Sequence, residues 1–218
     1  MPHSYTEDEL VEQPAIELFT ELGWQTMSAR DEIFGAGGTL RRETKSEVVL
    51  MGRLKAALQR FNPQLPPEAI TLALNELTRD RSTKAPLAAN REVYDRLKDG
   101  VIVSIPDRKH SGQTTERLRV IDWQNPDAND FLLTNQFSVT KTPYTCRPDL
   151  IGFVNGLPII VIELKKPGVP AQVAFEDNLT WYKGVIPQLF WSNPVLITSN
   201  GFDSRVGSLT SNWERFFE

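Results

Sequence analysis

The stretch RPDLIGFVNGLPIIVIELKKP, residues 147–167, decides the fold of this chain. Two apolar runs are separated by an Asn-Gly pair at 155–156, which is typical of a tight turn between antiparallel strands. Three ionisable residues flank the runs: Asp149 precedes the first, and Glu163 and Lys165 end the second. The pattern predicts a buried β-hairpin whose open end carries two carboxylates and one amine.

These residue types fit metal-dependent hydrolysis of a phosphodiester. Glu163 and Lys165 are two residues apart on a strand, so their side chains emerge on the same face. Two carboxylates that share a site repel each other, and a divalent ion removes this conflict; hard oxygen ligands favour Mg²⁺ or Mn²⁺. The amine of Lys165 can orient a water or stabilise charge on a scissile phosphate. The alternative is that Asp149 and Glu163 only flank strand ends and that Lys165 is a solvated terminus.

The register of the hairpin tests this hypothesis. A plain two-residue turn at 155–156 pairs Asp149 with Ile162, which sends Asp149 and Glu163 to opposite faces of the sheet. A three-residue loop, with Gly156 in the left-handed conformation of a G1 bulge, returns both to one face. We therefore predict an odd-length loop or a bulge in this hairpin.

Composition sets broad limits on the class of protein. The chain has 218 residues, of which 40% are hydrophobic and 24% charged, enough for one sizeable α/β domain or a domain with a helical insertion. No apolar run approaches ~20 residues, and the N-terminus lacks the pattern of a secretory signal. A single cysteine, Cys146, cannot form an internal disulfide, so we expect a reducing, cytoplasmic location. A net charge of −4 argues against a protein that coats nucleic acid, although not against a DNA enzyme with a local basic groove.

Hydrophobic periodicity predicts the organisation of the chain. A helix is expected over residues 6–22, with Pro14 either kinking it or opening a shorter one. Residues 28–47 are expected to form a mobile loop with little core to bury. Residues 47–99 are expected to be all-helical; their arginines could alternatively give a DNA-facing edge. From residue 101 the period changes to two, and over 131–139 the apolar residues are expected on one face only.

The predicted fold class is therefore α/β, with a mixed central β-sheet flanked by helices. Residues 1–218 are expected to form a single domain, within which residues 28–100 are a loop and helical insertion.

Longer motifs in the sequence resemble a known family. The hairpin, the helix after it and IPQLFWSNPVLITSNG at 186–201 resemble the N-terminal nuclease domain of type I restriction enzyme R (motor) subunits. ELVEQPAIELFTELGW at 9–24 is also similar to the first helix of such subunits. These nuclease domains belong to the RecB-like branch of the PD-(D/E)xK superfamily.

The resemblance implies roles for particular residues. Asp149 and Glu163 would bind the metal ion, Lys165 would be the catalytic lysine, and Glu12 would be an upstream acid that completes the metal site. The family tends to carry Gln-x-x-x-Tyr on the helix after the lysine. Here the tyrosine is Tyr182, but the glutamine position holds a shorter amide, Asn178.

The resemblance also implies a function: a Mg²⁺-dependent DNA endonuclease domain that works with an ATP-driven translocase. The sequence contains no G-x-x-x-x-G-K-[ST] motif, so ATP is expected to act only through a motor in a longer chain. The implied partners are double-stranded DNA and the modification and specificity subunits of a restriction complex. Two alternatives are a non-cleaving module that docks the motor onto partner subunits, and a stand-alone nuclease of the same superfamily.

Several other side chains lie near the predicted site in the sequence. Cys146 lacks a histidine at an informative spacing, which argues against nucleophilic catalysis. The aromatic residues of the following helix are expected to pack in the core rather than stack on bases. Four cationic residues are candidates for phosphate contacts with DNA: Lys166, Lys183, Arg147 and Lys141.

Overall fold

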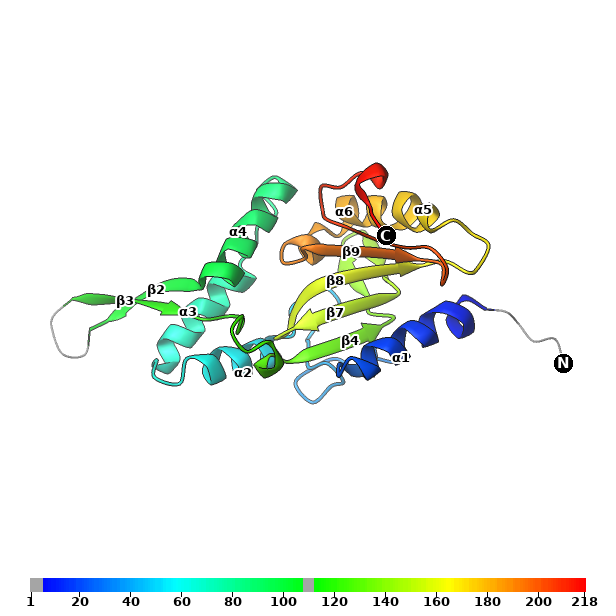
Figure 1. Cartoon of the computed structure of the whole chain (residues 1–218). Helices are drawn as coiled ribbons and strands as arrows, with labels where there is room; N and C mark the ends of the chain where they lie inside the picture. The colour runs from blue at the N-terminus through cyan, green and yellow to red at the C-terminus, as the bar shows by residue number, and fades with distance from the viewer. Residues whose placement is uncertain (1–5, 108–111) are drawn as a thin grey trace.

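The computed structural model describes residues 6–107 and 112–218 and is built around a six-stranded mixed sheet (Figure 1). Neighbouring strands are antiparallel except for two parallel pairs, β1 with β4 and β8 with β9. The order across the sheet is β1 (Gln25–Ser28), β4 (Phe131–Asn135), β7 (Leu150–Val154), β8 (Leu157–Leu164), β9 (Val195–Ser199) and β10 (Ser204–Gly207). The predicted mixed sheet is confirmed, and the predicted hairpin forms its centre as β7 and β8.

One face of the sheet is covered by the N-terminal helix, which has two parts, η1 (Asp8–Glu12) and α1 (Gln13–Glu21). Pro14 lies in the first turn of α1, where its missing N–H is tolerated, and the preceding turn η1 is a wider π-helical turn. The helix ends before Gly23, whose φ of 86° stops it. Its apolar side packs on Leu133, Leu150 and Ile162 of the sheet.

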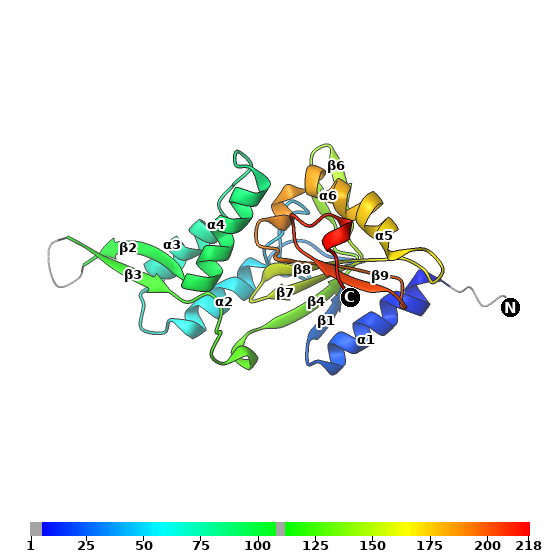
Figure 2. The ribbon, with the colours of Figure 1, turned by 45° about the horizontal axis from the view of Figure 1, so that its top comes forward.

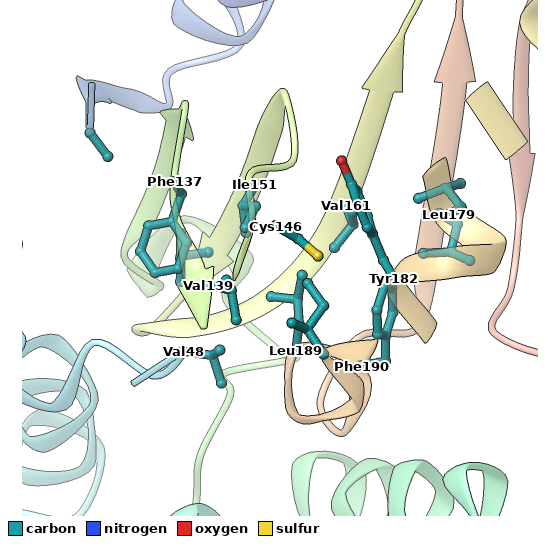
Figure 3. Packing of buried hydrophobic residues seen from close by; sticks show 14 of the residues in the cluster. Val48, Phe137, Val139, Cys146, Ile151, Val161, Leu179, Tyr182, Leu189 and Phe190 are labelled. Carbon is teal, nitrogen blue, oxygen red and sulfur yellow. The ribbon is translucent and has the colours of Figure 1, made fainter. Parts of the chain in front are cut away.

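The other face is covered by a helix that follows β8. It runs through α5 (Ala171–Val173), η3 (Ala174–Leu179) and α6 (Thr180–Val185), and a short 3₁₀ turn, η4 (Pro187–Phe190), follows. Leu179, Tyr182 and Phe190 pack on apolar side chains of the sheet such as Ile151 and Val161 (Figure 3). With α1 on the opposite face, the sheet is buried on both sides, and β7 and β8 are correspondingly apolar.

A second lobe lies beyond one end of the sheet (Figures 1 and 2). It contains α2 (Met51–Phe61), α3 (Pro67–Thr78), α4 (Pro86–Asp99) and a hairpin of β2 (Val101–Pro106) and β3 (Gln113–Leu118). The all-helical prediction for residues 47–99 is confirmed. The strand predicted at residue 101 forms, but it pairs with β3 and not with the central sheet. The division of the chain into one domain with an insertion at 28–100 stays a prediction.

The segment 28–47 is irregular, as expected, but the prediction that it buries little is wrong. Arg42 is 1% exposed and forms an ion pair with Glu32 at 2.5 Å. Its guanidinium donates to the carbonyl of Ser138 at 2.9 Å and lies 3.7 Å from the ring centroid of Phe137. A buried charge is stable only with such partners, so this loop is fastened to the sheet by a buried arginine.

The one-face alternation expected over 131–139 is also wrong. Leu132 and Leu133 are both buried, because β4 lies inside the sheet and is covered on both faces. The strand ends at Asn135, and Gln136 has a φ of 59°, which breaks the alternation.

Four short elements complete the fold. They are η2 (Pro126–Ala128), a hairpin of β5 (Val139–Lys141) and β6 (Tyr144–Cys146), and η5 (Trp213–Arg215). Among the helices within 6–107 and 112–218, none combines the length and the apolar character that crossing a membrane requires.

Candidate active site

The site lies at the open end of the β7–β8 hairpin. At the closed end, Val154 pairs with Leu157 around a two-residue turn, in which Asn155 and Gly156 have φ values of 52° and 81°. The predicted three-residue loop is therefore wrong, and the turn has the type I′ form that an Asn-Gly pair favours.

The predicted bulge is present, three residues beyond the turn. Phe153 pairs with Pro158 but Gly152 pairs with Ile160, so Ile159 is the extra residue on β8. From there on the register is shifted by one, and Leu150 rather than Asp149 lies opposite Ile162. This shift restores Asp149 and Glu163 to one face of the sheet.

Residues far away in the sequence stabilise the bulge. The side chains of Ser192 and Asn193 donate hydrogen bonds to the carbonyls of Pro158 and Ile159, at 3.1 and 2.8 Å. Pro158 has no N–H to give to a regular ladder, which favours an irregularity at this point. A side chain on Gly152, opposite the bulge, would come within 3.1 Å of the Trp24 ring, so a glycine is needed for the close packing there.

At the open end, the carboxylates of Asp149 and Glu163 each accept a hydrogen bond from a backbone N–H of the opposite strand. Oδ2 of Asp149 accepts from the N–H of Leu164 at 2.8 Å, and Oε1 of Glu163 accepts from the N–H of Asp149 at 3.3 Å. Glu163 is 1% exposed, whereas Asp149 is partly exposed. One carboxylate therefore lies inside the protein and the other at its surface, side by side.

Burial and mutual repulsion change the acidity of both groups. Burial raises the pKa of Asp149 to about 6, and the negative charges of Glu7 and Glu12 add to this effect. Burial, followed by the charge of Asp149, raises the pKa of Glu163 well above its usual range, although Lys165 and the Tyr182 hydroxyl act in the opposite direction. Lys165 offsets only part of this cost, so the pair would gain from a bound cation.

Three side chains link the carboxylates to the covering helix. The ammonium of Lys165 donates to Oδ1 of Asn178 at 2.8 Å, and Nδ2 of Asn178 lies 3.4 Å from the Tyr182 hydroxyl. The Tyr182 hydroxyl acts on Glu163 and favours its ionised form, which lowers the pKa of that carboxyl group. Figure 3 shows Tyr182 lying along β8. Lys165, Asn178 and Tyr182 thus form one chain of polar contacts beside Glu163, in which the shorter asparagine amide does reach the lysine.

Glu12 approaches the same end of the sheet from the α1 side. It is buried, and its carboxylate accepts from Nδ2 of Asn135 at 2.8 Å and Nε2 of Gln136 at 3.3 Å. Its charge contributes to the raised pKa of Asp149, so Glu12 acts on the site through its charge. Neither Asn135 nor Gln136 was expected at the site, because only the end of β4 brings them there.

Both covering helices widen into π-helical turns next to the site. Glu12 ends η1, and Asn178 lies in η3. Such turns are rare in proteins, and those that do occur are frequently found at functional sites.

The four cationic candidates do not form one group. Lys166 and Arg147 are exposed and close in sequence to the carboxylates. Lys183 instead lies over the ring of Phe175 at 5.2 Å, and burial lowers its pKa. Lys141 lines a different cleft, of about 600 Å³, where its charge acts on Asp80.

Two further expectations concern neighbouring residues. The core position expected for the aromatic residues holds for Tyr182 and Phe190 but is wrong for Trp181, which is 46% exposed and contacts the ring of Tyr144. Cys146 is buried, and burial together with Glu163 raises the pKa of its thiol to about 11, which agrees with its exclusion as a nucleophile.

The donor set of the site suits a hard divalent ion held by few protein ligands. Across residues 6–107 and 112–218, no three acidic, histidine or cysteine side chains lie close enough to hold an ion together. Mg²⁺ is often bound by one or two carboxylates, with water and phosphate oxygens as its other ligands. Asp149 and Glu163 meet this requirement, and a bound cation would offset the burial and mutual repulsion that raise the pKa of both carboxyl groups.

Comparison with known proteins identifies the family of the chain. Residues 4–215 match the family model of the type I restriction enzyme R protein N terminus. The chain belongs to this family. It is 33% identical over 210 residues to the type I restriction enzyme HindI endonuclease subunit of Haemophilus influenzae, covering 94% of this chain and 19% of that protein. It is 31% identical over 221 residues to the putative type I restriction enzyme MjaIXP endonuclease subunit of Methanocaldococcus jannaschii, covering 97% of this chain and 20% of that protein.

A shorter match involves the type I restriction enzyme SsaAORF53P endonuclease subunit of Staphylococcus saprophyticus, which is 35% identical over 97 residues, covering 44% of this chain and 10% of that protein. The chain spans about a fifth of the length of the first two relatives. The family predicted from the hairpin and its flanking motifs is therefore confirmed.

Proposed function

We propose that this chain is the Mg²⁺-dependent endonuclease domain of a type I restriction R subunit and cleaves phosphodiester bonds of double-stranded DNA. The observation that carries the proposal is the bulged hairpin, which brings Asp149 and Glu163 side by side with Lys165 two residues further along. Mn²⁺ would serve in place of Mg²⁺, since both are hard ions that oxygen ligands favour.

Each residue has a role in this proposal. Asp149 and Glu163 would hold the ion, which when bound lowers the pKa of a coordinated water and offsets negative charge on the phosphate. Lys165 would direct the attacking water or stabilise charge that develops on the phosphate. Asn178 would hold the lysine ammonium in place, and Tyr182 would favour the ionised form of Glu163.

Glu12 would serve as an auxiliary acid of the metal site. Asn135 and Gln136 already occupy its two oxygens, so it would act by charge, or through water, on the ion held by Asp149. Arg147 and Lys166 would contact DNA phosphates beside the carboxylates, whereas Lys141 and Lys183 would contribute less because they face other groups.

The domain would act together with other parts of a restriction complex. An ATP-driven translocase in the remainder of the R subunit would move DNA, and modification and specificity subunits would supply sequence recognition. Cleavage would then depend on ATP through the motor, while the chemistry would depend on the metal site of this domain.

The test is Lys165→Ala in the R subunit that contains this chain, assembled with its partner subunits and given Mg²⁺ and ATP. We expect DNA cleavage to fall at least about 10²-fold while ATP hydrolysis continues. Lys55→Ala, at an exposed lysine on α2, is the matched control and should cut as the unmodified enzyme does. Normal cutting by Lys165→Ala would refute the proposed catalytic role.

A further inference from the structure

A buried hydroxyl beside the site has no partner. Thr198 in β9 is fully buried, and its Oγ1 has no hydrogen-bond partner among the described residues. Nearly all buried polar groups in proteins form hydrogen bonds, because a buried hydroxyl without a partner loses its hydrogen bonds to water and gains none in return. Valine has the same shape and would fill this strand position without that cost. The hydroxyl therefore needs an explanation other than packing.

The position of Thr198 places it next to Glu163. β8 and β9 are parallel, and Thr198 is the register partner of Glu163. Leu196 packs in the same cluster as Tyr182, whereas Ile197 packs on the α1 side. Since side chains alternate along a strand, Thr198 faces the same side as Leu196, which is the side of Glu163 and Tyr182.

The cross-strand neighbours of Thr198 leave one acceptor for its hydroxyl. On β10 the residue opposite is Arg205, whose guanidinium only donates and is engaged with Asp203 at 3.0 Å. On β8 the neighbour is Glu163, a carboxylate. Of these two neighbours, only Glu163 can accept a hydrogen bond.

We propose that Thr198 is a positioning residue for Glu163: its hydroxyl donates a hydrogen bond to the Glu163 carboxylate when that group holds the metal ion. A carboxylate has about four acceptor sites, so Glu163 can accept from Thr198 in addition to the Asp149 N–H. The proposal rests on the function proposed above, because it gives Thr198 a role only in a metal-holding site.

The experiment compares Thr198→Val, which removes the hydroxyl, with Thr198→Ser, which keeps it. Mn²⁺ binding to the chain is measured by titration calorimetry, and the melting temperature is measured without metal. We expect Thr198→Val to weaken Mn²⁺ binding roughly tenfold, as for the loss of a hydrogen bond to a charged group, and Thr198→Ser to restore it. The melting temperature of Thr198→Val should not fall, because no protein hydrogen bond is lost in the metal-free state.

Two further variants make the outcomes distinguishable. Thr134→Val is the matched control: Thr134 is equally buried, but its hydroxyl has a partner in Ile151, so Mn²⁺ binding should not change. Glu163→Gln should abolish the Mn²⁺ binding that the unmodified chain shows. In the assembled enzyme, Thr198→Val should raise the Mg²⁺ concentration needed for half-maximal cutting without changing the affinity for DNA.

Each remaining outcome counts against a particular claim. If Thr198→Val binds Mn²⁺ as the unmodified chain does, the role of Thr198 is refuted and the site stands. If Thr198→Val lowers the melting temperature together with metal affinity, the residue is structural and the inference is wrong. If Glu163→Gln binds Mn²⁺ as well as the unmodified chain, both the site and the inference fail.

Discussion

The two ends of the β7–β8 hairpin bury polar side chains in opposite ways. At the closed end, Asn155 is fully buried, and its amide donates to the Val120 carbonyl at 3.0 Å and to Asn129 at 2.8 Å, while its oxygen accepts from the Asp130 N–H at 2.9 Å. At the open end, Glu163 is equally buried but is a carboxylate beside another carboxylate.

The difference shows which end contributes stability, and it supports the proposal that the other end holds a metal ion. A neutral amide with all its hydrogen bonds made strengthens the fold. Two adjacent carboxylates weaken it until a cation joins them, so their presence suggests that the protein retains them for function. Substitutions at the two ends should therefore have opposite consequences for activity and stability.

The largest effect is expected at the open end, from Glu163→Gln. This change keeps the shape of the side chain but removes the charge, so DNA cleavage by the assembled enzyme should fall on the order of 10³-fold. The free energy of unfolding of the chain at pH 8 without metal should rise, because a carboxyl group whose pKa is raised in the folded state costs stability at a pH above its unfolded-state pKa, and glutamine has no such group. Cleavage assays and chemical denaturation measure the two quantities. Wild-type cutting, or a marked loss of stability, would contradict the comparison.

The closed end should behave in the reverse way. Asn155→Ala removes the hydrogen bonds of a buried amide and puts alanine at a φ of 52°, so the free energy of unfolding should fall by about 3 kcal/mol. Cleavage per folded molecule should not change. Denaturation with urea measures the loss.

Asn155→Gly is the control for the turn, since glycine accepts the positive φ but also lacks the amide. Asn155→Gly should lose less stability than Asn155→Ala. The difference should equal the cost of placing alanine at a positive φ. A variant of Asn155 that folds normally yet cannot cut DNA would contradict the separation of the two ends.

The third prediction concerns pH. The folded-state pKa of Asp149 is about 6, above its usual 3.8, so the folded chain holds a proton that the unfolded chain releases. Stability should thus be highest below about pH 4 with respect to this group and fall as pH rises through 6, by at most about 3 kcal/mol. Asp149→Asn has no such proton, and its stability should decline less over this range.

The measurement is the difference in free energy of unfolding between the two proteins from pH 4 to pH 7, without metal. Carboxyl groups that do not interact with Asp149 titrate in both proteins and cancel in this difference. Glu163 adds to the difference, because the charge of Asp149 raises its pKa. Adding Mg²⁺ at pH 7 should narrow the gap, since the ion favours the ionised carboxylate. If the free energies of unfolding of the two proteins change with pH in parallel, the surroundings of Asp149 do not raise its pKa.

The sequence predicted which residues meet at the open end better than it predicted the geometry that brings them together. Asp149, Glu163 and Lys165 follow from their places at the ends of apolar runs, and the need for a bulge follows from strand alternation. The position of the bulge at Ile159 could not be predicted, because Ser192 and Asn193, which satisfy it, come from a segment more than thirty residues later.

Other features depend on tertiary contacts that periodicity does not report. Arg42 lies in a glycine-rich, charged segment that looks exposed, yet the carbonyl of Ser138 and the ring of Phe137 bury it. Thr198 reads as an ordinary strand residue, and only the register with Glu163 makes its hydroxyl informative. The edge strand β1 follows a helix too closely to give a clear alternating pattern of its own.

The smallest effect is expected at Asn178, where the sequence departs from the glutamine of the family. Its Oδ1 accepts from Lys165 at 2.8 Å, so Asn178→Ala should release the lysine and lower cleavage about tenfold, with unchanged affinity for DNA. Asn178→Gln keeps the amide on a longer side chain and should cut within about threefold of the unmodified enzyme. Single-turnover cleavage measures both variants. The control is Gln172→Ala, which removes a solvent-exposed hydrogen bond to Glu176 on the same helix. If Asn178→Ala cuts normally, the contact with Lys165 does not position the lysine, and the polar chain from Lys165 to Tyr182 has no part in the reaction.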